Sequence, residues 1–234
     1  MTTPSSSSSP NISVSMTWAF NAFKRNAATF LALAAVVVVV QFAQLVAFTP
    51  ILNTLTNCLD ASSPGQELAC RSASGLAVFF SWTLTFVFAL LAAFATIGVL
   101  RAALRTTQGV EPSFADMLTT QYLLRYIGFA ILFNIAFGIG FVLCFLPALA
   151  VIFFFELGHF SVLDRGTRPF AAFATSFRLA RANPVPMLMI VAMVILQVIA
   201  GSFLFGLVTL VVLPFTSLFI AHVYRSVNGE SVAS

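Results

Sequence analysis

The sequence carries very little charge. Only 8% of its 234 residues are charged, with 7 acidic side chains, 11 lysines and arginines and 2 histidines, whereas 60% are hydrophobic. A soluble domain has about 25% charged residues, so this chain has too few to cover a surface that faces water. It also lacks the alternating strands of ~10 residues that are typical of a membrane β-barrel. The composition therefore indicates a helical membrane protein.

Catalytic motifs are missing as well. The sequence has no G-x-S-x-G, HExxH or P-loop pattern, and its His, Ser and Asp residues do not cluster. The pair Gly138-x-Gly140 follows no predicted strand and lacks the third glycine of a nucleotide-binding loop. We therefore expect no enzyme, no cofactor and no metal site. We expect no nucleic-acid partner, since the basic residues lie at the ends of apolar runs.

Cysteine is scarce, with three residues and no CxxC pair. Cys58 and Cys70 lie in a hydrophilic connection over residues 49–75, on either side of a Pro64-Gly65 turn signal. If this connection is exported, a disulfide between them is favoured and would stabilise the fold by about 3 kcal/mol. The alternative is two free thiols.

Long apolar runs dominate what is present. About 20 apolar residues are needed to cross ~30 Å of hydrocarbon. Six such spans are predicted, with Pro50 expected to end the first and Pro214 expected to kink the last. Their approximate bounds are 27–48, 76–100, 126–143, 148–163, 186–205 and 207–224.

The spans group into three similar units. A short amphipathic segment precedes each pair of spans, over residues 15–26, 112–121 and 169–181. The second segment opens with an S-x-x-D capping signal at Ser113 and Asp116. We predict an all-α, polytopic membrane protein of six transmembrane helices in three hairpin units, each preceded by a cytoplasmic amphipathic helix. Residues 1–14 would be a disordered Ser-rich tail, 15–229 one domain, and 230–234 a C-terminal tail.

The positions of the basic residues predict the orientation. In the six-span arrangement, 10 of the 11 lysines and arginines fall on one side and Arg71 alone falls on the other. By the positive-inside rule, both termini and the amphipathic helices are cytoplasmic, and the cysteine-bearing loop faces outward. The expected location is the cell (cytoplasmic) membrane.

Glu156 is the most informative single residue, because it lies inside the fourth predicted span. A carboxylate in hydrocarbon is costly unless it is protonated or paired, so it is a candidate functional group. His159 follows one helical turn later. The pair could be a hydrogen-bonded packing feature, a side chain reaching the interface, or part of a proton or cation relay with His222. The Glu-x-x-His spacing also occurs in di-iron sites, but the spans hold no further acids.

Two amides, Asn134 and Gln197, lie within predicted spans and are expected to form inter-helix hydrogen bonds. A polar transport path is the alternative. Four basic side chains near the cytoplasmic ends could bind anionic headgroups or face solvent: Arg165, Arg168, Arg178 and Arg181.

Five short segments carry a resemblance to a known group of proteins: 18–26, 143–147, 162–166, 176–178 and 224–229. Through them the chain resembles actinobacterial six-span integral membrane proteins of the proline- and glycine-rich type. It is distantly similar to the YciC-like and glycerophosphodiester phosphodiesterase membrane-domain families. A short Ser-rich tail replaces the usual Pro/Gly-rich one. The resemblance implies an associating membrane protein, such as an accessory subunit of a respiratory complex, and supplies no catalytic residues.

The function predicted from the sequence is association with other membrane proteins or with lipids, as an accessory or scaffold subunit. The expected partners are the lipid bilayer and a larger membrane complex. The alternative is a small transporter or lipid-handling protein whose polar cavity is lined by Glu156 and His159.

Overall fold

The structure is a computed structural model that describes residues 11–59, 64–201 and 206–233. Within these ranges it contains helices and no strand, so the predicted all-α class is confirmed. The elements are α1 (Ile12–Arg25), α2 (Ala27–Leu59), α3 (Pro64–Thr107), the 3-10 turn η1 (Phe114–Met117), α4 (Leu123–Leu143), α5 (Phe145–Phe155), α6 (Leu157–Arg165), α7 (Pro169–Ala182), α8 (Pro184–Gly201) and α9 (Thr209–Val227).

Among the described residues, five helical stretches are long and apolar enough to cross a membrane. They are Ala27–Asn53, Gly75–Thr107, Leu123–Leu143, Phe145–Arg165 and Thr209–Val227. A sixth is added if α7 and α8, which meet at an angle of 112° around Asn183, are taken as one broken span. The helices are compatible with the predicted multi-pass membrane protein.

The first pair of spans is longer than predicted. Pro50 does not end α2, which continues to Leu59, and α3 begins at Pro64, so most of the expected loop over residues 49–75 is helical. A proline removes one backbone hydrogen bond, and residues 51–59 contain no second helix breaker. The predicted Cys58–Cys70 disulfide falls at this end of the helices. Because the side chain of Cys70 lies outside the described part of the chain, the pairing stays a prediction.

The prediction of an amphipathic helix over residues 112–121 is wrong in its length. The capping box between Ser113 and Asp116 forms, yet the segment makes only the single 3-10 turn η1. Tyr122 then adopts a positive φ of 58°, which breaks the helical path before α4. At the N-terminus, α1 begins at Ile12 instead of Ser15, because the Asn11 side chain accepts the Ser13 backbone N–H and caps the helix. The rest of the predicted Ser-rich tail lies outside the described residues.

Helix α9 lies at the centre of the fold. Of its most apolar stretch 67% is buried, against 22% to 28% in α2, α3 and α4. It packs against α1, α2, α3, α6 and α8. Small side chains at Thr216, Ser217 and Ala221 are buried and let neighbouring helices approach closely.

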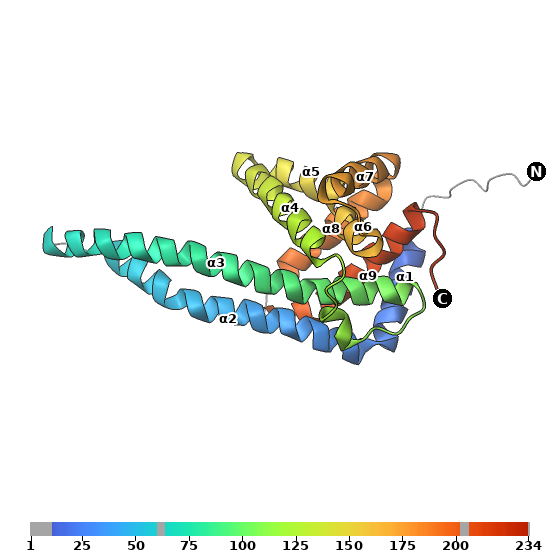
Figure 1. Cartoon of the computed structure of the whole chain (residues 1–234), viewed down its shortest axis with the longest axis horizontal. Coiled ribbons are helices and arrows are strands. Elements are labelled where there is room, and N and C mark those ends of the chain that lie inside the picture. The colour runs from blue at the N-terminus through green and yellow to red at the C-terminus, as the bar shows by residue number, and fades with distance from the viewer. Residues whose placement is uncertain (1–10, 60–63, 202–205, 234) are drawn as a thin grey trace, which may run out of the picture.

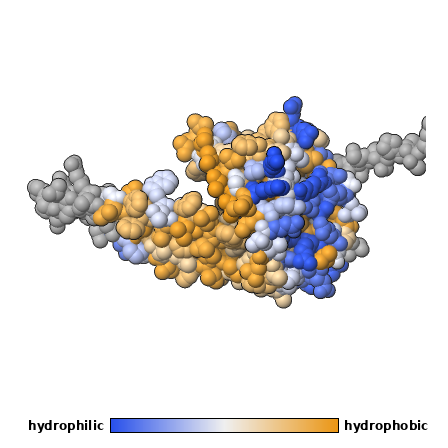
Figure 2. Space-filling model, viewed as in Figure 1, coloured by the Kyte–Doolittle hydropathy of each residue, from blue (hydrophilic) through white to orange (hydrophobic). Residues whose placement is uncertain are grey.

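Two helical arms extend from this core. The α2–α3 pair projects to one side in Figure 1, and α4 and α5 diverge from it in another direction. Hydrophobic side chains cover most of the visible surface of the arms, and hydrophilic ones gather at the opposite end, near α1 and the C-terminal segment (Figure 2). The arms therefore present apolar faces that the described residues do not cover.

Candidate functional site

The helix over residues 145–165 is interrupted at Glu156. The Glu156 backbone N–H still donates to the Ile152 carbonyl at 3.1 Å, but the His159 N–H donates to the Glu156 carbonyl, three residues back, at 3.3 Å. An i→i+3 bond tightens the turn locally. The interruption separates α5 from α6 and sets the directions in which the Glu156 and His159 side chains leave the backbone.

The His159 ring packs into a group of aromatic side chains on α4. Its centroid lies 4.8 Å from that of Phe129, 4.8 Å from that of Phe133 and 5.5 Å from that of Tyr126. Its buried Nδ1 atom has no hydrogen-bond partner among the described residues. A buried polar atom without a partner is costly, so this nitrogen is a chemically notable feature of the site.

Gly158 makes this arrangement possible. A Cβ atom built at this position would lie 2.2 Å from Cζ of Phe129, so any larger residue would push the Phe129 ring away. Phe129 is fully buried and also packs against Phe173 of α7, at 4.7 Å between ring centroids. The close contact between α6 and α4 thus depends on the missing side chain at Gly158.

Glu156 is half-buried and forms no ion pair or side-chain hydrogen bond with another described residue. The interpretation of Glu156 and His159 as a hydrogen-bonded pair is therefore wrong. The histidine ring is held by aromatic contacts on α4, and the tightened turn brings only the two backbones together. Glu156 stays a candidate for holding or exchanging a proton.

The relay considered as one alternative for Glu156, His159 and His222 is not joined by hydrogen bonds among the described residues. His222 lies on α9, where its ring centroid is 5.0 Å from that of Trp18 and its Nδ1 is 3.5 Å from the Ser226 hydroxyl. These neighbours differ from those of His159. No group of three His, Cys, Asp or Glu side chains suited to a metal ion occurs among the described residues.

The two amides have other neighbours than Glu156. Asn134 is exposed on α4, and its Nδ2 donates to the Ala130 carbonyl of the same helix at 2.7 Å. Half-buried Gln197 lines a cavity of about 310 Å³ together with Gln41 and Thr209. Neither side chain makes the predicted hydrogen bond to another helix of the described chain.

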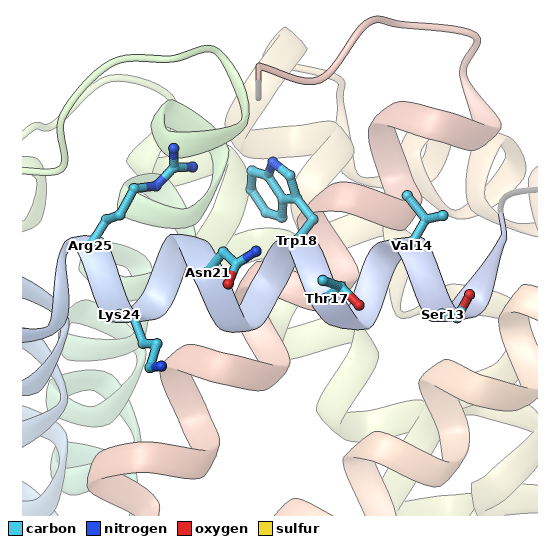
Figure 3. Close-up of a pocket in the computed structure, with 7 residues that line it drawn as sticks. All are labelled: Ser13, Val14, Thr17, Trp18, Asn21, Lys24 and Arg25. Carbon is cyan, nitrogen blue, oxygen red and sulfur yellow. The ribbon is translucent and has the colours of Figure 1, made fainter.

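Other cavities lie along α1 and between the arms. A shallow one of about 740 Å³ follows the polar face of α1, and in Figure 3 the Trp18 side chain points from that helix toward the C-terminal segment. Another, of about 540 Å³, lies between α3 and α4 and has Asn134 in its wall.

An ion-pair network that the sequence analysis missed joins α6, α9 and the C-terminal segment. Arg225 binds Asp164 at 2.6 Å and also binds Glu230, and Arg165 binds Glu230 from the other side. The Tyr224 hydroxyl donates to Asp164 at 3.4 Å. The charged and aromatic pairs Asp164-Arg165 and Tyr224-Arg225 are visible in the sequence. No local pattern, however, predicts a contact between residues about 60 positions apart.

Glu230 shows the electrostatic effect of this network. Burial alone would raise the pKa of its carboxyl group, but hydrogen bonds from Arg225 and Arg165, together with their positive charges, outweigh burial and lower the pKa below its ordinary value. Arg165 is thereby engaged within the chain. Of the four basic residues considered for headgroup binding, the exposed ones on or next to α7 are Arg168, Arg178 and Arg181.

Further arginines hold loops in place. The buried Arg101 donates to the carbonyl groups of Thr119 and Gln121, and Arg105 forms an ion pair with Asp116. Arg125 donates to the Gly166 carbonyl. In the sequence these arginines served only to predict the orientation of the spans. In the structure they also hold the loops at one end of the bundle.

Comparison of the chain with protein-family models, curated proteins and solved structures gives no match. The chemistry of the described residues therefore has to carry the functional interpretation. It offers a carboxyl group without a partner inside an apolar helix, an imidazole with one buried and unpaired nitrogen, amide groups that make no hydrogen bond to another described helix, and extensive apolar surface on two arms.

Proposed function

We propose that this chain is a non-catalytic, multi-pass membrane protein that acts by association, as an accessory or scaffold subunit of a larger membrane assembly. The observation that supports this most is the apolar surface of the two arms. The α2, α3 and α4 spans bury only 22% to 28% of their most apolar stretches within the chain. Such faces are available to other helices and to lipid.

The arrangement of the core supports the same proposal. The chain is held together at its hydrophilic end by α9, the ion-pair network and the arginine contacts, while the arms diverge from it (Figure 1). Helices that are joined at one end and present open apolar faces along the arms would suit a subunit that packs between other membrane proteins.

The proposed orientation follows the basic residues. Three hairpin units with amphipathic segments at the cytoplasmic face would place both termini in the cytoplasm and the α2–α3 tip outside. The same orientation would place the exposed arginines of α7 near anionic headgroups.

The proposal is tested by purifying the tagged full-length chain from native membranes in a mild detergent. We expect protein partners in stoichiometric amounts, recovered again when a partner carries the tag. A tagged, unrelated multi-pass protein expressed at the same level is the control. Recovery of the chain alone, with neither a protein partner nor bound lipid, would overturn the proposal.

A second candidate function is a small transporter that uses Glu156 and His159. One observation favours it, namely the buried His159 Nδ1 without a partner one turn from an unpaired carboxyl group. It predicts that Glu156→Gln abolishes a growth or flux phenotype while the protein stays abundant in the membrane. An unchanged phenotype would remove this candidate.

A further inference from the structure

The groove between α3 and α4 is a distinctive apolar surface of the molecule. It has a volume of about 540 Å³ and runs from Trp82 to Ala93 on α3 and from Ile127 to Ile135 on α4. At 1.5 Å per residue, the α3 wall is about 17 Å long, or three helical turns. Both walls belong to helices long and apolar enough to span a membrane.

The groove contains hydrogen-bonding groups that the described residues leave unused. Asn134 donates its amide N–H to the carbonyl of Ala130, and its Oδ1 accepts no hydrogen bond from a described residue. On the opposite wall, the Thr85 hydroxyl forms no hydrogen bond with a described residue. Asn134 lies 11 residues beyond Leu123, the first residue of α4, or about 17 Å into a hydrocarbon core of ~30 Å.

Lipid tails cannot satisfy these groups, because they have neither donors nor acceptors. Amide and hydroxyl side chains within membranes are found bonding to neighbouring helices. The walls also contain Ala89, Ala93 and Ala130, whose small side chains let another helix approach closely. The polar groups thus distinguish a helix from an acyl chain as the occupant.

We propose that the α3–α4 groove holds one transmembrane helix of a partner protein, and that this helix presents a hydrogen-bonding side chain to Asn134. This inference rests on the proposed accessory function and assigns that function to one surface. The partner helix would be apolar apart from a single serine, threonine, asparagine or glutamine at the depth of Asn134.

A photo-crosslinking amino acid at Ile131 tests the proposal in native membranes with the full-length chain. Ile131 lines the groove and is 45% exposed, whereas Ile139 lies on the same helix outside the groove, is 58% exposed, and serves as the matched control. We expect a protein adduct from position 131 and none of that mass from position 139. Adducts with lipid alone, or an adduct of twice the chain mass, would overturn the proposal.

Variants of Asn134 provide an independent readout. Asn134→Leu should lower partner recovery by about three- to twentyfold, the range of one inter-helix hydrogen bond in a membrane, and Asn134→Gln should restore part of it. Because Asn134 is exposed and, among the described residues, hydrogen-bonds only within its own helix, both variants should accumulate normally. If partners are recovered equally from all variants and crosslink elsewhere, this inference fails and the accessory function stands. If wild type recovers bound lipid but no protein partner, this inference fails, and if it recovers neither, the accessory function fails with it.

Discussion

The indole Nε1–H of Trp18 donates a 2.7 Å hydrogen bond to the backbone carbonyl of Ala233, near the opposite end of the chain. The backbone N–H of Ala233 in turn donates to the Thr107 carbonyl at 3.0 Å. The C-terminal segment is thus fastened between α1 and the end of α3. Residues 230–233, which belong to the stretch interpreted from the sequence as a tail, therefore contact the rest of the fold.

Trp18→Phe should therefore lower stability. The variant keeps an aromatic ring but loses the N–H donor, and one intramolecular hydrogen bond contributes about 1 kcal/mol. In a chain of this size that corresponds to about 2–4 °C in the melting temperature. Thermal unfolding in detergent, followed by circular dichroism, measures the change.

The matched control is Trp82→Phe. Trp82 is 74% exposed and donates no hydrogen bond to a described residue, so its replacement should leave the melting temperature nearly unchanged. Equal effects of the two variants would show that the Trp18–Ala233 bond contributes nothing measurable.

Stability should fall in mild acid through Glu230. Its pKa is lower in the folded state than its ordinary value of 4.5, because bonds from Arg225 and Arg165 outweigh the effect of burial. A group with a lowered folded pKa stabilises the fold above its unfolded pKa, and this contribution is lost as the pH falls through the folded pKa. We expect the melting temperature of the wild type to decline below about pH 4.5.

Glu230→Gln should be less stable than wild type at pH 7 and should show a smaller decline in acid, so that the two curves converge. Glu111→Gln is the control, since Glu111 is exposed and forms no ion pair with a described residue. Parallel pH curves for wild type and Glu230→Gln would contradict the role assigned to Glu230.

The sequence predicted the parts of this fold that depend on local composition. The third span, expected at 126–143, corresponds to α4 at Leu123–Leu143, because a long apolar run followed by a break at Cys144 is a strong local signal. The extension of α2 through Pro50 was missed, since polarity at residues 49–75 indicated a loop although few residues there forbid a helix.

The candidate site was predicted less well, for a different physical reason. Glu156 and His159 stand out in the sequence as polar residues in an apolar helix, but the neighbours of their side chains depend on how α4 and α7 pack against them. Likewise, Asp164, Arg225 and Glu230 meet only after the chain has folded, and no short-range pattern in a single sequence encodes that contact.

The predicted disulfide can be tested by counting thiols. If Cys58 and Cys70 are bonded, the denatured, unreduced protein should react with one equivalent of maleimide, at the free and exposed Cys144. After reduction it should react with three. Mass spectrometry of the labelled chain gives the count, and Cys144→Ser is the control that should remove the one reactive thiol. Three reactive thiols without reductant would show that the bond is absent.

Gly158→Ala should be among the more damaging small substitutions in the chain. The added methyl group would lie 2.2 Å from Cζ of Phe129, whose ring is enclosed by the rings of His159, Phe133 and Phe173. Because this ring has little room to move, overpacking should cost about 1–3 kcal/mol. Thermal unfolding in detergent measures this loss.

Gly138→Ala is the matched control for Gly158→Ala, because a Cβ at Gly138 would meet no described atom within 4 Å beyond the adjoining residues of its own helix, and alanine favours the helix. Its melting temperature should equal or exceed that of wild type. A double variant, Gly158→Ala with Phe129→Leu, should recover part of the loss, since leucine is smaller than the ring that the methyl group meets. If Gly158→Ala is as stable as wild type, the tight α4–α6 contact does not exist in solution. The position of His159 among its aromatic neighbours would then need another explanation.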